Sequence, residues 1–193
     1  MGNHRKTSGK KSGLRPRRHA RSYAVGHAML IRSADEADAD GIWQILEPVI
    51  RAGETYALPR DWTRAQALAY WFSAGPDVLV AEEAGNVVGT YYLRPNQRGG
   101  GSHVANCAYM TSITARGRGL GRAMGLHSLR RATASGFAAM QFNFVVSTNE
   151  NAVALWKSLG FAIVGTLPAA FRHPRLGLVD AFVMYRALDG AGY

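Results

Sequence analysis

The sequence predicts a single α/β domain of the α+β kind, with a mixed sheet of about seven strands and helices on both faces. Apolar segments of strand character alternate with segments of helical period in the order βααβββαβαββ. The length of 193 residues suits one core that folds without metals or disulfides. Cys107 is the only cysteine, which excludes an internal disulfide and favours a reducing compartment.

The N-terminal third of the domain should contain a short strand and two helices. Residues 30–34 are expected to form the strand, and 35–51 a helix in which Pro48 should cause a kink or the end. The apolar stripe of this helix consists of Ile42, Ile45, Leu46 and Val49. Residues 52–62 form a polar, aromatic loop, and Thr63 can cap a second helix with Leu68, Trp71 and Phe72 on one face. This loop and helix pair could cover a substrate.

The middle of the chain predicts three strands. Residues 77–83 and 87–94 flank a tight turn at Gly85-Asn86 and should pair as an antiparallel hairpin. A glycine-rich loop, 96–102, leads into a third long strand at 103–114.

The C-terminal part predicts two helices and three strands. A helix runs from Leu120 to about Gly136, and 138–146 follows as a central strand. Ser147 and Glu150 have the spacing of a capping box for a helix that Gly160 ends. Its apolar stripe is Ala152, Leu155, Trp156 and Leu159. Two strands, 161–166 and 180–188, enclose a Pro/Arg/His loop.

Positive charge is concentrated at the N-terminus. The chain has 23 Lys/Arg and 13 Asp/Glu, a net charge of +10, but residues 1–28 hold eight basic and no acidic residues. Subtracting these leaves fifteen basic and thirteen acidic residues in 29–193, a net of +2. We expect 1–28 to be a disordered basic tail, either native or from a mis-assigned start, and 29–193 to be the folded domain. Nucleic acid is therefore not expected as a partner.

Two classes of protein are not expected. A membrane-spanning helix needs about 20 consecutive apolar residues, and no such run occurs in the sequence. No Cys/His cluster has the spacing of a zinc site, so no metal is expected. We therefore expect a cytoplasmic protein.

The most informative segment is ITARGRGLGR at 113–122, between a strand and a helix. Successive backbone N–H groups at a helix N-terminus form a positive concave site for pyrophosphate, and glycines let the ligand approach the main chain. Arg116 and Arg118 can add charge-assisted hydrogen bonds. The spacing differs from the Walker loop and from the dinucleotide fingerprint.

Three motifs in order resemble the GCN5-related N-acetyltransferase (GNAT) family. The first is Ile31-Arg32-x-Ala34 with Asp38, which is similar to the family's opening. The second is the acetyl-CoA signature R-x-x-G-x-G/A, matched by Arg116-x-x-Gly119-x-Gly121. The third is Asn149-x-x-Ala152-Val153-x-Leu155-Trp156-x-x-Leu159-Gly160-Phe161. The resemblance covers about residues 31–188.

The resemblance implies a mostly antiparallel sheet that splays at a central parallel pair of strands. The pantetheine arm of acetyl-CoA, the expected cosubstrate, would pair with strand 103–114 and its pyrophosphate would bind the amides of 116–121. Members of the family are often dimers, so a homodimer is expected. The cofactor-binding residues implied in this way are Thr111, Ser112, Ile113, Arg116, Gly117, Arg118, Gly119, Leu120, Gly121, Arg122, Asn149 and Trp156.

Two departures from the family leave the catalytic groups open. Trp156 stands where the family often has a Tyr that protonates the leaving thiolate, and strand 103–114 lacks the family's frequent Glu. Glu54, in the loop that resembles the acceptor-side cover, is the best carboxylate for relaying a proton, and Tyr56 is a candidate contact for the substrate. Asn106 and Asn143 lie on the strands flanking the splay and either satisfy local backbone or bind and orient the acceptor.

The sequence therefore predicts transfer of an acetyl group from acetyl-CoA to the amine of a small molecule by direct attack. Residues 140–159, with 171–174 and 179–180, further resemble a subgroup that includes fungal azetidine-2-carboxylate acetyltransferases, which favours a small amino acid as acceptor. The alternatives are a protein or ribosomal acetyltransferase that docks through its basic tail, and a regulator that binds acetyl-CoA without turnover.

Overall fold

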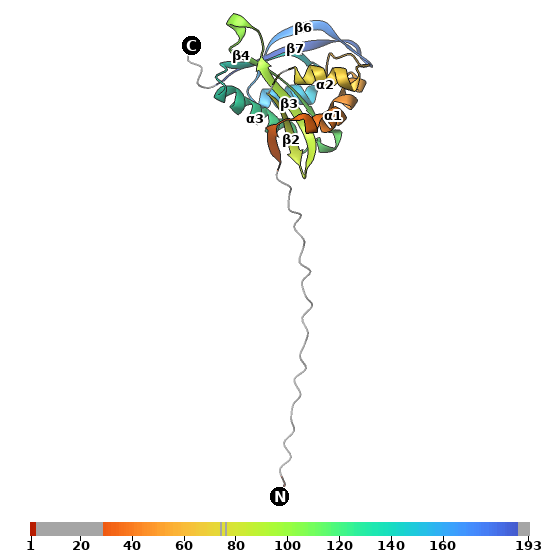
Figure 1. Cartoon of the computed structure of the whole chain (residues 1–193), viewed down its shortest axis with the longest axis vertical. Helices are drawn as coiled ribbons and strands as arrows, with labels where there is room; N and C mark the ends of the chain where they lie inside the picture. Colours follow the sequence, from red (N-terminus) through yellow and green to blue (C-terminus); the bar gives the residue numbers. More distant parts are fainter. Residues whose placement is uncertain (3–28, 74, 76, 189–193) are drawn as a thin grey trace.

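The domain is a seven-stranded mixed sheet with helices on both faces, as the sequence predicts (Figure 1). The computed structural model describes residues 1–2, 29–73, 75 and 77–188. The strand order is β1-β2-β3-β4-β5-β7-β6. The strands are β1 (Leu30–Ser33), β2 (Val78–Glu83), β3 (Asn86–Pro95), β4 (Val104–Thr111), β5 (Ala139–Val146), β6 (Ala162–His173) and β7 (Gly177–Ala187). The α-helices are α1 (Ala39–Ala52), α2 (Arg64–Phe72), α3 (Leu120–Ala134) and α4 (Glu150–Ser158).

Two hydrophobic cores lie on opposite faces of the sheet. Buried side chains of α1 and α2 pack with Val78, Val80 and Tyr92 on one face, whereas those of α3 and α4 pack with Tyr91 and Leu93 on the other. The alternation along β3 sends neighbouring side chains to opposite faces. Residues 90, 92 and 94 therefore face the α1/α2 side, where the sequence predicts the acceptor to bind.

The sheet parts at its one parallel pair among the described strands. β4 and β5 pair only at Val104↔Ala139 and Ala105↔Met140. Beyond these pairs, the rings of Tyr109, Phe142 and Trp156 pack together, with centroids 4.8 Å apart for both Tyr109–Trp156 and Phe142–Trp156. This aromatic wedge, drawn from β4, β5 and α4, fills one side of the space between the diverging strands.

Several predicted boundaries were wrong, each for a local reason. Pro48 was expected to kink or end the first helix, but α1 continues to Ala52, where Gly53 caps it in the left-handed conformation. Proline has no N–H to donate to the carbonyl four residues earlier, which is that of Gln44. Because Gln44 is exposed, its carbonyl can bond to water instead. The hairpin turn falls at Ala84-Gly85, both with positive φ, one residue earlier than predicted.

The C-terminal elements also differ from the prediction. Asn149, rather than the predicted pair of Ser147 and Glu150, caps α4, since its side chain accepts from the Ala152 N–H. The predicted Pro/Arg/His loop is mostly strand: β6 extends to His173 and β7 begins at Gly177, leaving only 174–176 as a turn. The β6–β7 pairing is interrupted by a register shift between Leu167 and Phe171, so the residues between them are accommodated as a bulge.

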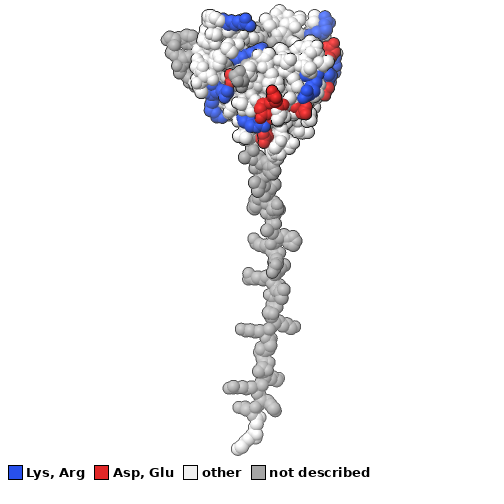
Figure 2. All heavy atoms as spheres, viewed as in Figure 1, with Lys and Arg blue, Asp and Glu red and all other residues white. Residues whose placement is uncertain are grey.

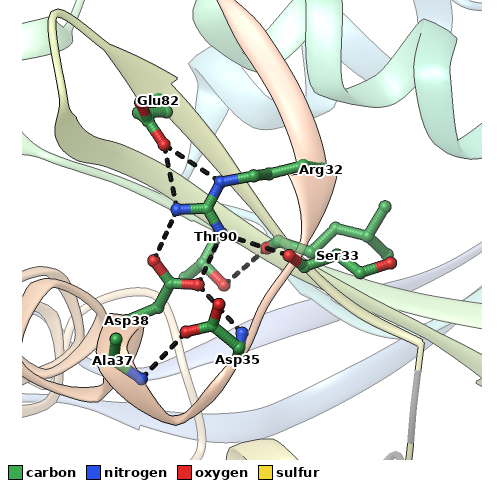
Figure 3. Close-up of polar contacts among 8 residues, drawn as sticks. Arg32, Ser33, Asp35, Ala37, Asp38, Glu82 and Thr90 are labelled. Carbon is green, nitrogen blue, oxygen red and sulfur yellow. Dashed lines mark hydrogen bonds and ion pairs between the residues drawn. The ribbon is translucent and has the colours of Figure 1, made fainter.

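The start of α1 is fixed to the sheet by one guanidinium group (Figure 3). Arg32 on β1 donates two hydrogen bonds to the Asp38 carboxylate, at 2.7 and 2.8 Å, and its Nε lies 3.0 Å from Oε2 of Glu82 on β2. Asp38 also accepts from the N–H of Asp35 at 2.9 Å. The Arg32 guanidinium holds the pKa of the Asp38 carboxyl below its ordinary value. Because α1 leads into the loop at 53–62, this clasp orients the acceptor side.

A buried hydrogen-bond chain holds α2 in place. The indole N–H of Trp71 donates to Thr90 Oγ1 at 3.0 Å, and Thr90 Oγ1 donates to the Leu79 carbonyl at 2.9 Å. The chain joins α2, β3 and β2 and sits directly under the α1/α2 core. Both ends of the loop at 53–62 are therefore attached to rigid elements.

Charged side chains of both signs lie side by side on the face of the domain seen in Figure 2. This mixture agrees with the small net charge of 29–193. The predicted tail, 1–28, lies almost entirely outside the described residues. No helix among the described segments is long and apolar enough to cross a membrane.

The Arg32 clasp predicts a pH-dependent loss of stability. Arg32→Met leaves Asp38, whose side chain is only 6% exposed, without its cation and should lower the free energy of unfolding by about 2–3 kcal/mol at pH 7. Because the folded-state pKa of Asp38 is lowered, the clasp stabilises fully above the ordinary value of 3.8 and is lost as the pH falls through the folded value. Urea titrations at several pH values test this.

Arg64→Met is the matched control, since Arg64 pairs with Asp40, whose side chain is 83% exposed. It should change the unfolding free energy by less than about 0.5 kcal/mol. Equal losses for the two variants, or a loss for Arg32→Met that persists undiminished in acid, would contradict the role of the clasp.

Candidate functional site

A cavity of about 260 Å³ lies where β4 and β5 part. It reaches from α4 on one side of the sheet to the loop at 53–62 and α2 on the other. Its lining comprises Thr55, Tyr56, Ala57, Leu58, Tyr70, Tyr92, Arg94, Asn106, Cys107, Ala108, Tyr109, Phe142, Asn143, Phe144, Val145, Val146, Asn149, Ala152 and Trp156. Five of the predicted site residues outside the signature turn line this cavity: Tyr56, Asn106, Asn143, Asn149 and Trp156.

The signature turn forms a backbone concavity at the start of α3. Gly119 is the N-cap of α3 with φ of 80°, and Gly117 has φ of 74°, so both need the left-handed region that glycine tolerates. A Cβ built on either would meet no protein atom within 4 Å and would instead project into the open space that a ligand would use. The backbone N–H groups at a helix N-terminus suit a pyrophosphate, so this turn fits the diphosphate of CoA.

Gly121 has a different reason to be glycine. A Cβ there would lie 3.2 Å from Leu155 Cδ2, and one at Gly125 would lie 2.7 Å from Leu159 Cδ1. These small residues allow α3 and α4 to pack closely. The turn is thus held against the helix that carries Trp156 and Asn149.

The three predicted arginines of the turn differ in their partners. Arg116 is exposed and has no ion pair within the described part of the chain. Arg118 forms an ion pair with Glu83, and Arg122 donates to Ser158 Oγ at 2.9 Å. Arg116 is therefore the guanidinium most available to an anion.

The remaining predicted cofactor residues occupy distinct positions. Thr111 ends β4, and the hydroxyls of Ser112 and Thr114 are 2.9 Å apart at the beginning of the turn. Ile113 is 57% exposed, whereas Leu120 is buried in the core, so only the backbone of Leu120 can face a ligand. Asn149 caps α4 and also lines the cavity.

The Tyr56 hydroxyl is hydrogen-bonded to the backbone of β4 where β4 and β5 separate. Its hydroxyl donates to the Tyr109 carbonyl at 2.6 Å and accepts from the Tyr109 N–H at 2.9 Å. Burial raises the pKa of Tyr56 above its ordinary value, so the phenol stays protonated and can make both bonds. Both backbone groups of Tyr109 are thus bonded to a side chain that also lines the cavity, so a bound group can compete with Tyr56 for them.

A chain of carboxamides runs along the same cavity. Asn106 Nδ2 donates to the Gln141 carbonyl at 2.9 Å, bridging β4 and β5 just past their last backbone pair. Asn143 accepts from Gln141 Nε2 at 2.7 Å and donates to Asn96 Oδ1 at 2.6 Å. Asn106 thus satisfies local backbone with its nitrogen, which leaves Oδ1 to accept a hydrogen bond from a ligand.

Glu54 lies at the border of the acceptor side. Its Oε1 is 2.9 Å from Nη2 of Arg175, which belongs to the β6–β7 turn, and it is not part of the cavity lining. This ion pair joins the loop at 53–62 to the β6–β7 hairpin. The role of Glu54 as a proton relay stays a prediction.

Most of the other lining residues were not predicted from the sequence, and four of them carry groups that could act on a ligand. Tyr70, Tyr92 and Arg94 surround its acceptor end, and Tyr109 contributes both its backbone and its ring. The period of β3 could have indicated Arg94, which shares a face with Thr90 and Tyr92 and lies opposite Asn106 in the register.

Cys107 also lines the cavity, but its thiol is poorly suited to be a nucleophile. Burial raises the pKa of Cys107 to about 12, so almost none is thiolate at neutral pH. The arrangement therefore favours direct attack by the acceptor.

A sheet parted at its parallel pair, with a helix N-terminus that suits a diphosphate at one end of the gap, is the arrangement that the sequence resemblance predicts for an acetyltransferase that uses acetyl-CoA. The model of the acetyltransferase (GNAT) family matches residues 39–161. The chain belongs to this family.

Three relatives agree with this assignment. N-acetyltransferase aca1 of Schizosaccharomyces pombe is 30% identical over 151 residues, which are 69% of this chain and 72% of the relative. A GCN5-related N-acetyltransferase structure from Kribbella flavida has 44% identity and a TM-score of 0.79, covering 83% of this chain and 98% of its own. The phosphinothricin acetyltransferase of Sinorhizobium meliloti, solved with acetyl-CoA, has 25% identity and a TM-score of 0.72, covering 83% and 88%. The chain is an acetyl-CoA-dependent acyltransferase.

The backbone concavity predicts a selective loss of cofactor affinity. Gly119→Val should weaken acetyl-CoA binding by at least about 10-fold, because the new side chain fills the space of the diphosphate. Gly136→Val is the control, since Gly136 follows α3 with φ of 81° and also has no neighbour within 4 Å. Calorimetry should show a large rise in Kd for acetyl-CoA in Gly119→Val alone. Equal Kd values for the two variants would contradict a role of the turn in binding acetyl-CoA.

Proposed function

We propose that the chain acetylates the amine of a small molecule, specifically an amino acid or a close analogue. The observation that carries this proposal is the small size of the cavity, together with the two contacts that border its proposed acceptor end. The Tyr56 hydroxyl ties the loop at 53–62 to β4, and the Glu54–Arg175 ion pair ties the same loop to the β6–β7 turn. A cavity of about 260 Å³ bordered in this way suits a compact acceptor better than a peptide.

The cofactor end of the site would position the acetyl donor. Acetyl-CoA supplies an activated thioester when it is bound. In our proposal the amides at 116–121 and Arg116 hold its diphosphate, and the aromatic wedge keeps the strands apart for the pantetheine arm. Asn149 and Trp156 would border that arm, because both line the cavity from α4.

The Tyr109 N–H is the candidate group for stabilising charge on the acetyl oxygen. It belongs to a cavity-lining residue, and the β-strand fixes its direction, so only the Tyr56 hydroxyl to which it donates has to move. Tyr56 would have to release this N–H when the acetyl group arrives. Its displaced hydroxyl would then be available near the reacting atoms.

The acceptor amine must lose a proton before it attacks, because an amine of pKa about 10 is mostly protonated at neutral pH. We propose that water carries this proton to Glu54 at the border of the site. Asn106 and Asn143 would orient the nitrogen, since both line the acceptor side of the cavity.

Two broader expectations complete the proposal. We propose a cytoplasmic enzyme, supported by the single buried thiol at Cys107.

We also propose that the enzyme is a homodimer. Size-exclusion chromatography with light scattering tests this, and a monomer at micromolar concentration would contradict it.

An assay of CoA thiol release from acetyl-CoA tests the proposed function. Small amino acids and cyclic imino acids should be acetylated with kcat/KM at least about 100-fold above peptides with free N-termini, because a cavity of about 260 Å³ has little room for the rest of a peptide. A preference for peptides would contradict the small-molecule acceptor.

The same assay across pH tests the proton relay. Glu54→Gln should move the rising limb of the pH–rate profile to higher pH, because the proton then passes to water alone. Arg175→Gln is the control, since it breaks the ion pair but keeps the carboxylate. An unchanged limb in Glu54→Gln would exclude Glu54 from proton transfer.

A further inference from the structure

Arg94 is the one side chain of permanent charge in the cavity lining. It belongs to β3, is half-buried, and lies directly opposite Asn106 of β4 in the sheet register. Its Cζ is 4.8 Å from the centroid of the Tyr92 ring, and its Nη2 is 3.5 Å from the Tyr92 hydroxyl. This stacking fixes the plane of the guanidinium at the acceptor end.

No carboxylate neutralises this cation within the described residues. The ion pairs of those residues do not include Arg94, and the cavity lining contains no Asp or Glu. A guanidinium remains charged at every working pH, and a partly desolvated charge is stabilised by an anionic partner. The cavity therefore has the electrostatic character of a site for a compact anion.

We propose that Arg94 determines acceptor specificity by binding the carboxylate of the amino acid. This inference rests on the proposed function and assigns its recognition of the acid group to one residue. The planar guanidinium can donate two parallel hydrogen bonds to a carboxylate, and the Tyr92 hydroxyl can donate a third. Burial raises the pKa of Tyr92 above its ordinary value, which keeps that hydroxyl a donor.

The register also places the amine of such an acceptor. Asn106 lies opposite Arg94, and Tyr92, on whose ring the Arg94 guanidinium stacks, lies opposite Ala108, one residue before Tyr109 on β4. An α-amino or cyclic imino acid held at Arg94 would direct its nitrogen along β4 toward the Tyr109 amide. The free Oδ1 of Asn106 can accept a hydrogen bond from that nitrogen on the way. Long diamines and amines without an acid group lack the anchor.

Matched pairs of acceptors test the inference. Proline and pyrrolidine, and azetidine-2-carboxylate and azetidine, differ only in the carboxylate. The wild-type enzyme should favour each acid over its amine by at least about 10-fold in kcat/KM. Arg94→Gln should raise KM for the acids by about 10- to 100-fold with little change in kcat, and leave the values for the amines within about 3-fold.

Two further variants separate binding from structure. Arg94→Lys keeps the charge but loses the paired hydrogen bonds, so its KM for the acids should fall between those of wild type and Arg94→Gln. Arg98→Gln, an exposed position outside the cavity lining, should leave all four acceptors unchanged. Thermal melting and acetyl-CoA binding, measured on each variant, should match wild type.

The outcomes distinguish this inference from the proposed function. Equal losses on acids and amines in Arg94→Gln would overturn the role of Arg94 and leave the proposed amino-acid acceptor standing. Equal use of acids and amines by wild type would overturn both the role of Arg94 and the preference for an amino acid. Turnover of peptides alone would overturn the small-molecule acceptor itself, and the inference with it.

Discussion

The parting of β4 and β5 is the constraint on which the rest of the structure depends. Backbone pairing stops after Ala105↔Met140, and the rings of Tyr109, Phe142 and Trp156 occupy one side of the gap while Asn106 bridges it from the other. Buried backbone groups are costly without partners, so the freed edge of β4 needs a substitute for the lost strand. In this structure the Tyr56 hydroxyl takes that place at Tyr109, and in the proposed reaction the cosubstrate does.

Each end of the gap is controlled by a different face of the sheet. On the α3/α4 face, Gly121 and Gly125 allow close helix packing and so hold the anion-binding turn beside Trp156. On the α1/α2 face, the Arg32 clasp fixes the start of α1, and the Trp71–Thr90 hydrogen bond fixes α2. The loop at 53–62 connects these two helices. The proposed cofactor end is therefore built from backbone geometry, whereas the proposed acceptor end is built from side chains. This difference explains why the family is evident while the acceptor must be proposed.

The sequence was most informative where chemistry depends on local backbone. The helix stripes and the element order predicted the fold, and the Gly/Arg turn predicted the helix N-terminus where we place the cofactor, because glycine spacing and period are local properties. Predictions failed where tertiary packing overrides local signals: α1 continues through Pro48, and β6 extends through Pro168. Arg94 was missed because its neighbours along the chain do not show that it lies opposite Asn106 in the sheet. Arg32 and Asp38 were identified only as part of a family motif, whereas in the structure they form the clasp.

Amide hydrogen exchange on β4 tests the central claim most directly. If the gap receives the donor, acetyl-CoA at concentrations that saturate the protein by calorimetry should slow exchange at 107–111 of β4 and at 116–121 of the turn. Exchange along β2 and β6, which are remote from the gap, should not change. Saturation with acetyl-CoA that leaves 107–111 unprotected would contradict the account, because the donor would then bind elsewhere than between the parted strands.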